Sequence, residues 1–204
     1  MRDLATMVKF NEDNHEYKLG GIHIPSMSEM MLPIMGTYPL DPYYAERGTA
    51  VHDLTEAIDK NRFDPILSDP ELLPYMFAYQ DWHEAHEVEI LEIEKVLFNP
   101  KLLYAGTMDR MWIIDGEKNL TDIKSGLKYR QHVIQLVGYA LCNFGEFKIS
   151  NLYLNPYINK FHTWTDAESM KAVHMVESLS AVYWEIHRRD LRLVSKFIKE
   201  QQNG

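Results

Sequence analysis

The stretch 106-GTMDRMWIIDGEKNLTDIKSGLKYRQHVIQLVGY-139 decides the fold. It predicts a strand, a tight turn, a second strand and then a helix, because Asp115-Gly116 lies between two runs rich in β-forming residues. If these two residues make up the whole turn, Ile114 pairs with Glu117 and the position numbers of all paired residues sum to 231. The turn length therefore fixes which side chains of the two strands face each other.

This register places Asp109 directly opposite Asp122, with Cβ atoms about 4.5–5.5 Å apart. Facing carboxylates repel, and one of them should take up a proton unless a cation lies between them. Oxygen ligands suit Mg²⁺, Mn²⁺ or Ca²⁺. Lys124 follows two residues after Asp122, so it points to the same face about 6.6 Å further along. A four-residue turn would instead bring Asp109 opposite Ser125, and Asp109 would then serve as a surface acid paired with Arg110 or Lys124.

The length of 204 residues predicts a single domain over 1–204, with residues 1–25 as an N-terminal hairpin appendage. Hydrophobic residues make up 46% of the chain, enough to bury a sizeable core. We expect no membrane association, because no apolar run is long enough to span a bilayer and the N-terminus lacks the apolar segment of a signal peptide.

Cysteine and charge narrow the classes further. The single Cys142 excludes an intramolecular disulfide and a four-cysteine zinc or iron–sulfur site, so we expect a reducing compartment such as the cytoplasm. The net charge of −9 argues against a histone-like nucleic-acid binder. It does not argue against a nucleic-acid enzyme, whose acids cluster where a metal ion neutralises them.

The remaining chain predicts an α/β fold in which a central mixed β-sheet, containing the 104–124 hairpin, is flanked by helices 42–60 and 129–144. Gly20-Gly21 is expected to end the N-terminal hairpin, and Ser26 and Asp166 are expected to cap helices. The other expected elements are a hairpin over 7–18, helices over 27–35, 70–87 and 167–189, and strands over 88–98, 147–154 and 160–164.

Two further groups of side chains have chemical potential. Glu92 and Glu94 share one face of the strand over 88–98, although its alternation of apolar and polar residues is imperfect. His83 and His86 lie in the segment HEAHE, three positions apart rather than the four that a metalloprotease helix requires. We interpret HEAHE as a solvated helix face and keep a zinc site there as an alternative.

Taken in order, the segments form a set: RGTAVH ending at His52, GTMD ending at Asp109, Asp122-Ile-Lys124, and Gln135 followed four residues later by Tyr139. This set resembles the RecB-like branch of the PD-(D/E)xK nuclease superfamily. The opening, FNEDNHEY followed by IPSMSE, is similar to phage-type exonucleases of that superfamily. The resemblance covers nearly the whole chain and implies a restriction-endonuclease-like nuclease core.

The resemblance also implies a role for each matching residue. Lys124, Asp109 and Asp122 would be the catalytic residues. His52, Asp109, Asp122 and the main-chain carbonyl of Ile123 would bind the metal. Gln135 and Tyr139 would line the substrate site, with Glu94 as an additional acid. Arg47, Lys128 and Arg130 flank these segments and are candidates to hold a phosphate backbone, or else are surface charges.

The sequence thus favours a metal-dependent DNA nuclease that uses Mg²⁺ or Mn²⁺ and no iron–sulfur cluster. By resemblance it would be an exonuclease of recombination or DNA end processing, encoded by a bacterium, phage or prophage. It would form a homo-oligomer and work with a single-strand annealing or recombination partner protein. Two alternatives stay open: a nucleic-acid-binding module without turnover, and a zinc-dependent hydrolase using His83 and His86.

Overall fold

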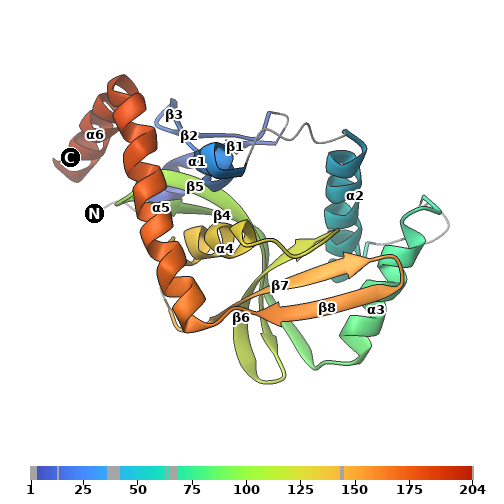
Figure 1. Ribbon diagram of the computed structural model, residues 1–204. Helices are drawn as coiled ribbons and strands as arrows, with labels where there is room; N and C mark the ends of the chain where they lie inside the picture. The colour runs from blue at the N-terminus through green and yellow to red at the C-terminus, as the bar shows by residue number, and fades with distance from the viewer. Residues whose placement is uncertain are drawn as a thin grey trace.

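A computed structural model describes residues 4–12, 14–35, 42–62, 64, 69–142 and 145–203 (Figure 1). Its centre is a five-stranded mixed sheet of order β4-β5-β6-β7-β8, in which only β6 and β7 run parallel. A second, antiparallel sheet has the order β1-β2-β3. The predicted α/β class with a central mixed sheet is confirmed. The strands are β1 (Val8–Asn11), β2 (Glu16–Leu19), β3 (Ile22–Ile24), β4 (Val88–Asn99), β5 (Tyr104–Ile114), β6 (Glu117–Lys124), β7 (Lys148–Asn155) and β8 (Ile158–Thr163).

The central hairpin has the predicted register. Paired residues run from Ile114–Glu117 to Arg110–Thr121, so Asp115-Gly116 is the whole turn. Both turn residues have positive φ, 50° and 82°, as a two-residue hairpin turn of type I′ requires.

The two strands of the hairpin separate where the catalytic acids were predicted. Counted away from the turn, Asp109 and Asp122 are the first residues beyond the last pair, Arg110–Thr121. Near its N-terminal end, β5 contacts the segment that precedes α1 instead of β6. There the amide of Ala105 donates to the carbonyl of Pro25 at 2.9 Å. The acids therefore lie where the sheet opens rather than within a continuous ladder.

Helices cover both faces of the large sheet (Figure 1). On one face α2 and α3 pack against Trp112, Ile123 and Leu152. On the other face α1, α4 and α5 pack against Met108 and Leu120. The helices are η1 (Leu4–Met7, a 3₁₀ turn), α1 (Met27–Met35), α2 (Pro42–Asp59), α3 (Leu73–Glu84), α4 (Gln131–Ala140), α5 (Asp166–Ile186) and α6 (Arg188–Asn203). Among the residues that the structure describes, no helix is both long and apolar enough to cross a membrane.

Several expected boundaries were wrong at the N-terminal sheet and the last helices. Gly20 and Gly21 follow the last residue of β2 and so end the hairpin as predicted, but with φ of 59° and 84° they also turn the chain into β3, a strand that was not predicted. Thr165, not Asp166, caps α5, since its hydroxyl accepts from the Glu168 amide in a capping box. The predicted helix 167–189 ends at Ile186, and a new helix begins at Arg188.

The boundaries of α1 and α4 were predicted more closely. Ser26 caps α1 as expected, its hydroxyl accepting from the Glu29 amide at 2.9 Å. The helix predicted over 129–144 spans Gln131–Ala140, and residues 143 and 144 lie outside the described part of the chain.

Candidate metal and catalytic site

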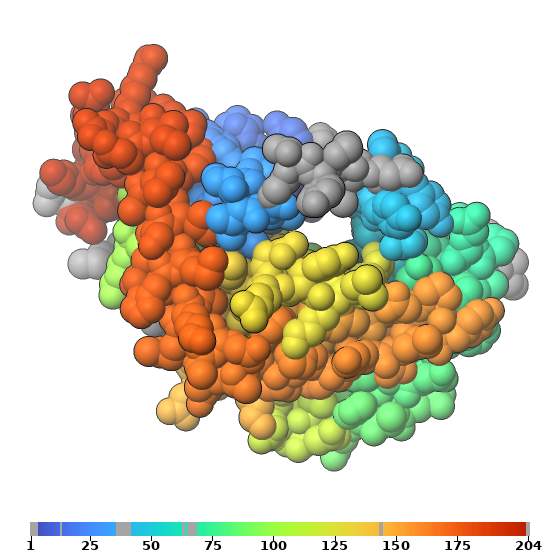
Figure 2. Space-filling model, in the orientation of Figure 1, coloured from blue at the N-terminus to red at the C-terminus, as the bar shows by residue number. Residues whose placement is uncertain are grey.

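A cleft of about 630 Å³ opens where β5 and β6 separate. In Figure 2 it appears as a hollow between α1, α2 and α4. The cleft brings together residues from both sheets and three helices, which range from Phe10 to Tyr139 in the sequence. The predicted site residues that line it are His52, Glu94, Asp109, Asp122, Lys124, Gln135 and Tyr139.

Three of these side chains form a group with metal-binding chemistry. One potential ligand atom from each of His52, Glu94 and Asp109 lies within 4.8 Å of the other two. Glu94 and Asp109 meet because they fall opposite each other between the pairs Ile93–Arg110 and Lys95–Met108 of β4 and β5. His52 reaches them from α2, with Nδ1 3.3 Å from Asp109 Oδ2. One imidazole nitrogen and two carboxylates suit Mn²⁺ or Mg²⁺.

The electrostatics and backbone of Glu94 support this fit. Burial and the nearby Asp109 carboxylate raise the pKa of Glu94 to about 8, although Arg110 opposes the shift. Its φ of 47° lies in the left-handed region, which glutamate rarely adopts and which is found at functional sites. A strained, like-charge pair is unfavourable by itself, and a divalent cation bound between the carboxylates would relieve the repulsion. The chemistry of this group therefore suits a bound divalent cation.

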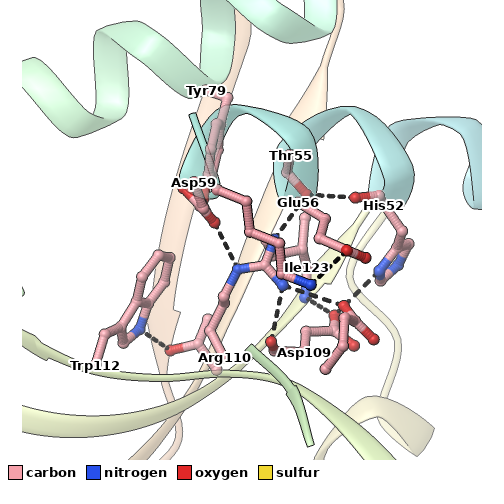
Figure 3. A network of polar contacts seen from close by, with 12 residues as sticks. His52, Thr55, Glu56, Asp59, Tyr79, Asp109, Arg110, Trp112 and Ile123 are labelled. Atoms are coloured by element: carbon pink, nitrogen blue, oxygen red, sulfur yellow. Dashed lines mark hydrogen bonds and ion pairs between the residues drawn. The ribbon is translucent and has the colours of Figure 1, made fainter. Parts of the chain in front are cut away.

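Asp109 is held on two sides. Its Oδ2 accepts the amide of Ile123 at 2.7 Å and faces the His52 ring (Figure 3). The amide of Ile123 is free to reach this carboxylate because the ladder between β5 and β6 has already ended. The predicted role of the Ile123 carbonyl as a metal ligand stays a prediction.

Asp122 differs from the expected facing pair. It is only 2% exposed, and its two oxygens have separate donors: Lys124 Nζ at 2.9 Å on Oδ1 and Asn151 Nδ2 at 2.8 Å on Oδ2. Burial raises its pKa to about 6; Lys124 lowers it and Asp109 raises it. The two carboxylates grouped with His52 are thus those of Glu94 and Asp109, while Asp122 is oriented by its own partners.

Lys124 is protonated in this setting. Burial opposes its charge, but the carboxylates of Asp122 and Asp109 more than offset burial and raise its pKa. The ammonium group can therefore offer its charge and its N–H donors to an anion, rather than serve as a base.

Asn151 is a site residue that the sequence reasoning missed. Its amide orientation is fixed, because Oδ1 accepts the indole N–H of Trp164 at 2.8 Å and only Nδ2 can then donate to Asp122. It stands beside Asp122 in the parallel register of β6 and β7 and is fully buried. The available signal was an amide directly before the apolar run LYL in the strand KISNLYLN.

Arg110 is the second missed residue, and Figure 3 shows its guanidinium bound to Asp59. Its fully buried guanidinium donates to Glu94 Oε1 at 3.1 Å and to Asp59 Oδ2 at 2.6 Å. The hydroxyl of Tyr79 donates to both oxygens of the same Asp59 carboxylate, at 2.9 and 2.8 Å. This buried network contacts Glu94 from the protein interior, opposite the cleft. The signal was the cation Arg110, which follows Asp109 between the apolar strand residues Met108 and Met111.

Gln135 and Tyr139 lie together on α4. Gln135 Nε2 donates to the Tyr139 hydroxyl at 3.0 Å, and Tyr139 is buried rather than part of a solvated helix face. The tyrosine ring fits because position 106 is glycine: an added Cβ would lie 2.5 Å from Tyr139 Cε1. Gly106 of the GTMD segment thus allows the ring to lie against β5.

Arg47 and the two histidines of HEAHE are placed elsewhere. Arg47 is absent from the cleft lining; it donates to the carbonyl of Ser125 at 3.0 Å and its guanidinium lies 5.0 Å from the Tyr44 ring centre. His83 faces Asp59 at 3.5 Å, whereas His86 contacts the carbonyl of Trp82. Within the described part of the chain, the cluster at His52 is the one with three potential ligands.

Comparison with known proteins gives a limited likeness. No family model matches the chain, and no curated protein matches its sequence. Among solved structures, an alkaline exonuclease (LHK-Exo) from Laribacter hongkongensis is 15% identical, with a TM-score of 0.43. The complex of LHK-Exo with dAMP is 16% identical, also with a TM-score of 0.43. Each match covers 85% of this chain and 84% of the other.

Proposed function

We propose that this protein is a metal-dependent nuclease that hydrolyses phosphodiester bonds in DNA. The observation that carries the proposal is the group of His52, Glu94 and Asp109 beside the protonated Lys124, in a cleft open enough for a polymer. Acids alone would repel a polyanion, but around a divalent cation they bind one. The proposed ligands are His52, Asp109 and Asp122, with Glu94 as a further acid and the Ile123 carbonyl completing the set.

Each residue of the site has a part in the proposed reaction. A bound Mg²⁺ or Mn²⁺ would polarise the scissile phosphate and acidify the attacking water. Lys124, positioned by Asp122, donates N–H groups to the phosphate and stabilises the charge that develops there. Gln135 and Tyr139 contribute an amide and a hydroxyl along the cleft wall, where they orient the strand.

The finer assignments follow the sequence resemblance. We infer an exonuclease acting in recombination or DNA end processing, of phage or prophage origin. We also infer a homo-oligomer and a partner protein that anneals or recombines the strand left behind. Arg47, if it contacts DNA at all, does so from outside the cleft lining.

The test is cleavage of end-labelled linear DNA and of covalently closed circular DNA, with EDTA, Mg²⁺ or Mn²⁺. We expect cleavage of the linear substrate alone, lost in EDTA and restored by either cation. Undiminished cleavage in EDTA would remove the metal from the proposal. Binding without cleavage under every condition would favour a nucleic-acid-binding module, and cleavage dependent on stoichiometric zinc would favour a zinc hydrolase.

A further inference from the structure

The segment from Leu127 to Arg130 connects β6 to α4 and forms part of the cleft wall. Leu127 and Tyr129 line the cleft and are 69% and 52% exposed. Lys128 between them points the other way, as alternate residues of an extended segment do. In Figure 2 this yellow segment borders the hollow on one side and the orange strands β7 and β8 on the other. The segment thus joins the cleft to the outer surface of the sheet.

Cationic groups gather on that outer surface. Lys128 Nζ lies 2.6 Å from His162 Nε2 and 4.3 Å from the Trp164 ring centre. Lys160 lies two residues before His162 on β8 and so shares its face of the strand. Burial, Lys128 and Lys160 lower the pKa of His162, and Glu168 raises it. Arg130 is exposed and lies two residues after Lys128 in the chain.

These charges have little to neutralise them. Among the described residues, no carboxylate lies within ion-pair distance of Lys128, Arg130 or Lys160. One acid, Glu168, acts on Lys128 and His162, and its carboxylate also accepts from the amide and hydroxyl of Thr165 in the capping box of α5. A chain of net charge −9 that keeps unpaired cations together gains from this only if a polyanion binds there.

The aromatic side chain decides between kinds of polyanion. Inside a duplex both faces of every base pair are covered by stacking, and only the terminal pair has a free face, so an exposed ring at a cleft wall stacks most readily on unpaired bases. We propose that Leu127–Arg130, together with Lys160 and His162, forms a binding surface for single-stranded DNA. On it Tyr129 stacks on a base while Lys128, Arg130 and Lys160 contact phosphates. This inference rests on the proposed nuclease function and specifies the form in which its substrate enters the cleft.

Binding is measured in EDTA, so that it does not depend on turnover. The ligand is a fluorescent oligothymidylate of about 12 nucleotides, compared with the same strand in a duplex. Tyr129→Ala should weaken single-strand binding about 5- to 100-fold, the range for loss of one stacked base, and Tyr129→Phe should restore it. Lys128→Gln with Lys160→Gln should reduce the slope of log affinity against log salt by about 1.4, since each single-strand phosphate contact contributes about 0.7.

The matched control is Lys118→Gln with Lys171→Gln, which removes the same charge from exposed positions on other elements. It should leave the affinity and the salt slope nearly unchanged. An equal loss in the control and the test variant, an undiminished Tyr129→Ala, or a duplex bound as tightly as the single strand would overturn the inference. Hydrolysis of a small chromogenic phosphodiester by the wild type with Mn²⁺ tests the nuclease function separately, so each can fail without the other.

Discussion

Replacing Glu94 by Gln should make the metal-free protein more stable while weakening its hold on a divalent cation. Gln has nearly the same shape and keeps an oxygen that can accept from Arg110, but it carries no charge next to Asp109. The comparison variant is Glu92→Gln on the same strand, since Glu92 is exposed and pairs with Lys95 at 2.7 Å.

The magnitude follows from the raised pKa of Glu94. In the folded protein this pKa is about 8, against an ordinary value of 4.5, mainly because of burial and the Asp109 charge. The folded state therefore binds this proton more tightly than the unfolded state does. The stability contributed by the group is complete below about pH 4.5 and is lost progressively as the pH rises towards 8.

At pH 7 this loss is about 3 kcal/mol, which we reduce to about 2 kcal/mol because 29% of the side chain faces solvent. Glu94→Gln stays neutral and should avoid it. Its melting temperature without metal should exceed that of the wild type by about 4–8 °C at pH 7. The difference should vanish near pH 4.5, and Glu92→Gln should melt like the wild type at both values.

Calorimetry with Mn²⁺ supplies the second half of the test. A cation that binds Glu94 must displace its proton, so the wild type should release up to one proton more than Glu94→Gln between pH 6 and 8. Titrations in two buffers of different ionisation enthalpy count these protons. Equal proton release by both proteins would refute the reasoning and return Glu94 to the role of an acid paired with Arg110.

Three further substitutions test other parts of the site. Lys124→Met should lower turnover at least about 100-fold with little change in Mn²⁺ affinity, and a near wild-type rate in a cleavage assay would mean that the lysine is not catalytic. Asn151→Leu should weaken Mn²⁺ binding about 10- to 100-fold by calorimetry, because a carboxylate loses the donor that orients it; unchanged affinity would contradict this. Gly106→Ala should cost about 1–3 kcal/mol of stability in thermal melts, since its Cβ would overlap the Tyr139 ring, whereas Gly126→Ala has open space and should be neutral.

The central hairpin could be predicted from the sequence because a single local signal fixes it. Asp115-Gly116 demands positive φ at two successive positions, and the register of β5 and β6 follows from that turn. The helices after Ser26 and Pro42 were predictable for a similar reason, since their starts depend on residues adjacent in the chain. Local chemistry thus accounts for the elements and their order.

The composition of the acid group could not be predicted in the same way. Whether Glu94 faces Asp109 depends on an irregularity between Ile90 and Glu92, which shifts the pairing of β4 by one residue. Which partners Asp122 meets depends on β7, which begins 24 positions after Lys124 and aligns Asn151 with Asp122 in the parallel ladder. Both facts come from long-range pairing, for which the sequence carries no turn or cap.

Three features that break local rules converge on the cleft, and this argues for a site rather than a set of surface charges. Glu94 has a left-handed backbone, Arg110 is a fully buried cation, and Asn151 is an amide in an apolar strand. Each costs stability, and a protein retains such costs where they serve function. All three concern carboxylates that line the cleft. Glu94 is one of these and is bound by Arg110, and Asn151 binds another, Asp122. Since a cation bound to the folded state would recover part of this cost by mass action, metal should stabilise the wild type more than any variant in which one of these supports is lost.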